Sequence, residues 1–138
     1  MKHWDFETLI IVMVASLAAV FMAITFIQSG LDKVFDYRGN LAFMKEQFSK
    51  TFLKNTIGIF LPLILVFELI SGLLCVGGVI QIFMKEGREM LVYGFLLSGI
   101  TLLMLLFGQR VSKQYPGAVS LTGYFIITLI GLLVVAMR

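Results

Sequence analysis

Four long apolar segments constrain this chain more than any other feature of its sequence. They run approximately from Thr8 to Leu31, Ile57 to Met84, Met90 to Gly108 and Gly117 to Met137. A helix needs about 20 mostly apolar residues to cross the hydrocarbon core of a bilayer, where only helices and closed barrels satisfy their backbone polar groups. The sequence therefore predicts an all-α integral membrane protein with four spanning helices.

The composition excludes several other classes of protein. Hydrophobic residues make up 59% of the 138-residue chain and charged residues 14%, whereas soluble domains average about 45–50% and about 25%. A soluble enzyme, a disordered chain and a secreted disulfide scaffold are thus excluded. With one cysteine, Cys75, and one histidine, His3, we expect no internal disulfide, no metal site and no cofactor held by this chain's own ligands. The net charge of +3 indicates membrane-surface contacts and no nucleic-acid partner.

The connections predict how the spans are arranged. Residues 85–89 and 109–116 form short polar turns, so the helices that they join should be antiparallel. Pro116 suits the first turn of the last helix, where its missing N–H costs nothing. We expect a single domain over 1–138, an up-down four-helix bundle with both termini on one side. Seven Lys and Arg residues on one side against four on the other favour a cytoplasmic long loop by too small a margin to fix the orientation.

The long connection between the first two spans has a helical pattern of its own. Asn40 is a candidate N-cap, and Leu41, Met44, Phe48 and Phe52 recur at helical spacing. Lysines and a glutamate occupy the other positions around the helix. This pattern predicts an amphipathic helix over about 40–54 that lies in the membrane interface with its apolar face toward the lipid. The alternative is a solvated loop with scattered aromatic residues.

Glu68 is the most informative single residue, because it lies near the middle of the second span. An acidic residue there costs roughly 2.5–3.5 kcal/mol unless it faces the protein interior. We predict that Glu68 points into the bundle, protonated, and hydrogen-bonded to a hydroxyl from another span. Gly72, one turn further, should mark the closest approach of a neighbouring backbone. By depth, the candidates for a shared cofactor-binding pocket are Glu68, Thr101, Tyr124 and Thr128; the other interpretation is that Glu68 only fixes the packing.

A second polar cluster closes the first span: Gln28, Ser29, Gly30, Asp32, Lys33 and Asp36. Lys33 is expected to extend toward the interface, and the alternative is that it turns inward toward Asp36 or a bound head group. About 16 Å of depth separates Lys33 from Glu68, which is too far for direct contact, and Thr25 and Gln28 would bridge this gap. The small residues Ala15, Ala19, Ala23, Gly94 and Ser98 predict packing seams.

Two of these segments together resemble a known family. The run Ile27-Gln-Ser-Gly-Leu-Asp-Lys-Val-Phe35 resembles the Gly-x-x-Lys signature of DoxX-like membrane proteins, and residues 61–77 resemble that family's Pro…Glu-x-x-x-Gly-x-x-x-x-Gly second helix. The positions that match the family's motifs are Gly30, Lys33, Pro62, Glu68, Gly72 and Gly77. The chain departs from many such proteins in having no arginine at the start of its first span and no cysteine pair, which argues against a thiol-redox version.

The resemblance implies a small multi-pass protein of the bacterial inner membrane. Our first hypothesis is a non-catalytic accessory or structural subunit of a larger complex with other integral membrane subunits, respiratory and quinone-linked complexes included. The alternative hypothesis is a membrane module that binds a quinone or a lipid, with Glu68 in a pocket inside the bundle. A proton-linked transporter is a third and weaker hypothesis, because one buried carboxylate without relay partners makes a poor pathway.

Overall fold

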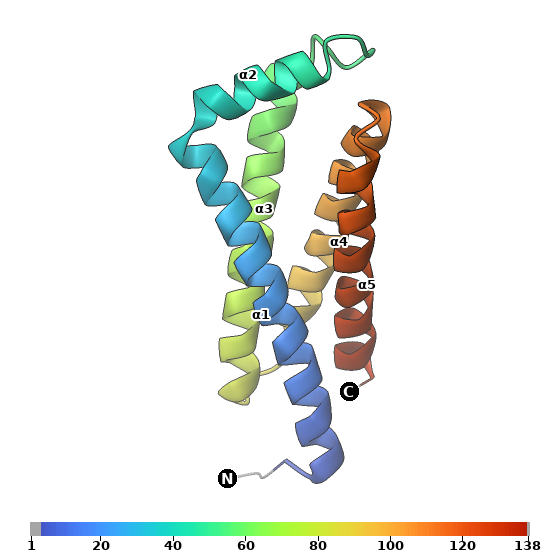
Figure 1. The fold of residues 1–138 in the computed structure, drawn as a ribbon. Helices are drawn as coiled ribbons and strands as arrows, with labels where there is room; N and C mark the ends of the chain where they lie inside the picture. The colour runs from blue at the N-terminus through green and yellow to red at the C-terminus, as the bar shows by residue number, and fades with distance from the viewer. Residues whose placement is uncertain (1–3, 138) are drawn as a thin grey trace.

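The computed structural model describes residues 4–137, which form five α-helices (Figure 1). His3, and two of the four cations counted on the side opposite the long loop, Lys2 and Arg138, therefore lie outside the described residues. The helices are α1 (Phe6–Phe35), α2 (Tyr37–Gln47), α3 (Ile57–Phe83), α4 (Glu89–Val111) and α5 (Tyr115–Ala136).

Four of the five helices, α1, α3, α4 and α5, are long and apolar enough to cross a membrane. The all-α class and the four long apolar helices are thus confirmed, and Pro116 lies in the first turn of α5 as predicted. The largest error in the predicted bounds is at the end of α1, which continues to Phe35 instead of ending near Leu31. Asp5 begins this helix, because its carboxylate accepts a hydrogen bond from the Thr8 N–H.

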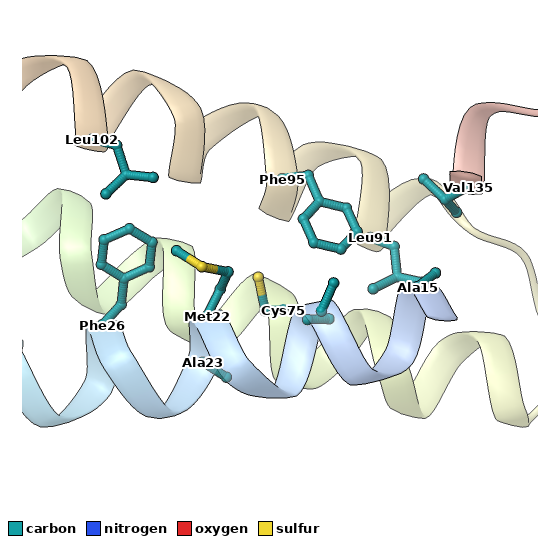
Figure 2. Packing of buried hydrophobic residues seen from close by; sticks show 11 residues of the cluster. Ala15, Met22, Ala23, Phe26, Cys75, Leu91, Phe95, Leu102 and Val135 are labelled. Atoms are coloured by element: carbon teal, nitrogen blue, oxygen red, sulfur yellow. The ribbon is translucent and has the colours of Figure 1, made fainter. Parts of the chain in front are cut away.

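The four long helices surround one core. α1 packs against α3 and α5, and α4 packs against the same two helices. In Figure 1 the start of α1 and the end of α5 lie at the end of the bundle opposite α2. Figure 2 shows how Met22 and Phe26 from α1 meet Phe95 and Leu102 from α4 in this core, beside Cys75 of α3.

Small residues set the closest helix contacts, as the sequence predicts. Ala15, Ala19 and Ala23 are buried along α1. The closest approach of a neighbouring backbone is at Gly78, however, and not at Gly72. A Cβ atom on Gly78 would lie 2.7 Å from the Leu91 backbone nitrogen of α4, whereas at Gly72 the nearest backbone atom would be 3.4 Å away. The tightest contact is therefore between α3 and α4, which a short turn holds together.

The amphipathic segment is helical over a different range from the predicted one. Asp36, not Asn40, is the N-cap of α2, since its carboxylate accepts a hydrogen bond from the Gly39 N–H. The helix ends at Gln47, and the chain continues to Thr56 as a series of turns. In these turns the side-chain hydroxyls of Ser49 and Thr51 donate hydrogen bonds to nearby backbone carbonyls. Such local hydrogen bonds compete with a continuing helix.

The two phenylalanines that follow α2 have opposite environments. Phe48 is 2% exposed and packs toward Gly108 of α4, whereas Phe52 is 75% exposed and meets only the edge of the Phe107 ring. We expect Phe48→Leu to lower the free energy of unfolding by about 1 kcal/mol, because it leaves a gap against α4. Phe52→Leu is the matched control and should change it by less than about 0.5 kcal/mol. Thermal unfolding in detergent measures both, and equal losses would contradict the different packing.

Candidate functional site: an ion pair and cavity between the spans

The contacts between α1 and α3 fix how far the two helices are offset. A Cβ atom on Gly30 would lie 2.5 Å from Leu69 Cδ2, and one on Gly72 would lie 2.6 Å from Ile27 Cγ1. The antiparallel helices therefore pair position 30 with 69 and position 27 with 72. In this register α3 begins about two turns beyond the end of α1, or about 10 Å along the axis. The offset brings Lys33, near the end of α1, level with position 66 of α3, within one turn of Glu68.

As a result, Lys33 and Glu68 form an ion pair. Lys33 Nζ lies 2.8 Å from Glu68 Oε1, with the Lys33 side chain 16% exposed and the Glu68 side chain 2% exposed. The ammonium also donates to Ser29 Oγ at 2.7 Å and to the Ser29 carbonyl at 3.5 Å. These three partners use all three hydrogens that an ammonium group can donate.

This geometry confirms one prediction about these two residues and corrects two. Glu68 points into the bundle, as predicted. Its Oε1 atom is met by the Lys33 ammonium and has no hydroxyl partner among the described residues, so the predicted hydrogen bond to a hydroxyl from another span is wrong. The prediction that Lys33 extends to the interface is also wrong. It assumed that all spans end at the same level, which the offset between α1 and α3 removes.

A cavity of about 430 Å³ lies beside the ion pair, between α1, α3, α4 and α5. Tyr124 of α5 and Gln109 of α4 line it together with Glu68. Gln109 Oε1 is buried without a hydrogen-bond partner among the described residues. The polar residues that line the cavity are Thr25, Gln28, Ser29, Asp32, Lys33, Glu68, Gln109 and Tyr124.

Two of the four pocket candidates do not line this cavity. Thr101 is buried beside Ser71, which lies one turn of α3 beyond Glu68. Its hydroxyl lies 3.2 Å from Ser71 Oγ and donates to the Leu97 carbonyl. Thr128 is buried and donates to the Tyr124 carbonyl. Their hydroxyls are thus satisfied within the helix packing. Of the sequence candidates, Glu68 and Tyr124 share the cavity.

A smaller cavity of about 200 Å³ lies under α2. Lys33, Leu105 and Gln109 border both cavities. Gln109 was not predicted from the sequence as a site residue, because residues 109–116 were assigned to a short polar turn. In the structure Gln109 lies in the last turn of α4.

The remaining family-motif positions serve the packing of α3. Gly30 and Gly72 admit Leu69 and Ile27, Gly77 lies against the Met90 side chain, and Pro62 lies in the second turn of α3. No group of three potential metal-ligating side chains occurs within residues 4–137. No family model, curated protein or solved structure matches this chain.

Chemically, the arrangement is suited to binding. Its wall combines apolar side chains with a larger number of polar ones, and its volume falls within the range of about 300–1,000 Å³ that is usual for small-molecule sites. The carboxylate and the ammonium come from two adjacent helices, α3 and α1, and are paired with each other, so a polar group that enters the cavity meets this ion pair in its wall.

Proposed function

We propose that this chain is a multi-pass protein of the bacterial inner membrane that binds a lipid-soluble molecule, a quinone or a lipid, in the cavity beside Glu68. The observation that carries the proposal is the buried Lys33–Glu68 ion pair in the wall of a cavity at membrane depth. Ionisable groups inside a membrane protein are costly and mark ligand or ion pathways more often than they serve packing alone. The proposal makes this a binding module without catalysis of its own.

The same observation supports the DoxX-like resemblance as a proposal. Lys33 and Glu68 come from the two separate segments that resemble the family's motifs, and the fold places them in contact. A contact between two motif positions on different helices supports the resemblance more strongly than either short motif does by itself.

Retention of the ligand tests the binding function. The full chain is purified in mild detergent, and its organic extract is analysed by mass spectrometry for quinones and lipids. We expect about one molecule per chain. Leu121→Trp places an indole in the cavity and should remove the ligand. Leu129→Trp is the matched control, because Leu129 is half-exposed on the same helix and should leave retention unchanged.

Two outcomes would contradict the binding function. Extracts of the unmodified chain that contain no quinone or lipid would show that the cavity holds neither molecule. Equal retention by the Leu121→Trp and Leu129→Trp variants would place the bound molecule elsewhere on the protein.

The accessory-subunit role is a second candidate, favoured by the surface around α2. Phe35, Phe43 and Phe52 are exposed there beside the cations Arg38 and Lys45. An amphipathic surface of this kind suits either the predicted position of α2 in the membrane interface or contact with another membrane subunit. Native electrophoresis of gently solubilised membranes separates the two: a subunit migrates with a large complex, and a free monomer contradicts the subunit role.

A further inference from the structure

An apolar groove runs along the outer side of α1 and α3, on the other side of α1 from the Glu68 cavity. Its volume is about 630 Å³, and aliphatic side chains such as Val20, Ile27, Val79 and Ile80 line most of it. It follows α1 from Val20 to Phe35, a length of about 22 Å at 1.5 Å per residue. One leaflet of the hydrocarbon core is about 15 Å thick, so the groove is long enough for an acyl chain.

Three residues of α1 separate this groove from the cavity. Ile24, Gln28 and Asp32 are spaced four residues apart and form one ridge along the helix, and each of them borders both spaces. Asp32 lies one turn before the end of α1, close to the start of α2, the helix that is predicted to lie in the membrane interface. A molecule with its polar head at Asp32 and its chain in the groove thus has the orientation of a lipid within a leaflet.

The charges at this ridge select the kind of head group. The Lys33 ammonium is committed to Glu68 and Ser29 and has no hydrogen left to donate. The Asp32 side chain is exposed and, within residues 4–137, has no ion-pair or hydrogen-bond partner. Gln109 Oε1 adds a buried acceptor without a partner. With two carboxylates and one ammonium, the site has a formal charge of minus one and an excess of acceptors.

We propose that the occupant is a lipid with an ammonium-bearing head group, seated with the ammonium between Asp32 and the cavity and one acyl chain in the groove. The inference rests on the proposed binding function and names the ligand class for that site. An anionic head group is disfavoured because the only cation lining the cavity is already paired. A quinone, which has no cationic group, would leave the Asp32 carboxylate without a partner.

The test compares two lipids with identical acyl chains. The full chain in mild detergent is mixed with equal amounts of phosphatidylethanolamine and phosphatidylglycerol, and the retained lipid is measured by native mass spectrometry. We expect phosphatidylethanolamine to be retained about tenfold more, which corresponds to about 1.4 kcal/mol. Asp32→Asn should abolish this preference. Glu46→Gln, which removes an exposed carboxylate from α2, is the control and should preserve it.

A second pair of variants tests the groove itself. Ile80→Trp fills the groove and should reduce the retention of both lipids. Ile70→Trp is the control, because Ile70 is on the same helix, is similarly exposed (44% against 55%) and lies outside the lining of the groove and the cavity. Since both isoleucines are on the outer surface, neither variant should prevent folding.

The outcomes separate this inference from the proposed function. Equal retention of the two lipids by the unmodified chain, or a preference that survives Asp32→Asn, overturns the head-group assignment. If Leu121→Trp removes a bound molecule and Ile80→Trp does not, or if the bound molecule is a quinone, the inference fails and the binding function stands. A dimer of the chain that Ile80→Trp dissociates would show that a second copy, and no acyl chain, covers the groove.

Discussion

Lys33→Met is expected to lower the free energy of unfolding by about 3–5 kcal/mol. The substitution leaves the Glu68 carboxylate buried without its cation, and loss of one partner of a buried ion pair has effects of this size. The Met side chain is close to Lys in length and keeps the apolar contacts of the stem. Unfolding in mixed micelles with increasing fractions of a denaturing detergent measures the change. The sequence alone predicts a mild effect, because it places Lys33 in water.

The double variant distinguishes a lost charge partner from lost packing. Lys33→Met combined with Glu68→Leu removes both charges, and replacement of a buried pair by apolar residues of similar volume is often neutral or stabilising. We therefore expect the double variant to recover most of the stability that Lys33→Met loses. Arg38→Met, at an exposed position on α2, is the control for removal of a cation. A Lys33→Met variant no less stable than Arg38→Met would contradict the buried pair.

The helices were predictable because their signal is local. Each span is a continuous apolar run whose burial or lipid contact is decided by its own residues, so α3, α4 and α5 begin and end close to the predicted positions. The burial of Glu68 was predictable for the same reason: a charged group at that depth has few tolerable environments. The bounds of α2 were less predictable, since Asp36 and Asn40 are both suitable N-cap residues. Only the folded backbone, in which the Asp36 side chain accepts from the Gly39 N–H, selects Asp36.

The ion pair was not predictable, because it depends on the offset between two helices. Depth counted along each span assumes that the spans start level, whereas the contacts of Gly30 and Gly72 set a different register. Depth also leaves the direction of a side chain around its helix undetermined. Thr101 was therefore assigned to the Glu68 pocket, although it faces Ser71. Both errors concern how helices pack together, which the pattern within one helix does not contain.

The α3–α4 contact gives the second large effect, and it has a control that should change stability in the opposite direction. Gly78→Ala is expected to lower the free energy of unfolding by about 1–3 kcal/mol. The added methyl would lie 2.7 Å from the Leu91 nitrogen and 2.9 Å from its Cα. Because both are backbone atoms, no side-chain rotation makes room, and the helices must move apart.

Gly123→Ala introduces the same methyl in the interior of α5, where a Cβ would have no atom within 4 Å. Alanine favours a helix over glycine by up to about 1 kcal/mol, so this variant should be slightly stabilised. Opposite signs for the two substitutions, measured by thermal unfolding in one detergent, would show that contact at Gly78 and not helix propensity controls the response. A stabilised Gly78→Ala variant would contradict the close approach of α3 and α4.

That approach also positions the cavity, because α4 carries Gln109 and α3 carries Glu68. Gly78→Ala should therefore weaken ligand retention as well as stability, whereas Gly123→Ala should leave retention unchanged.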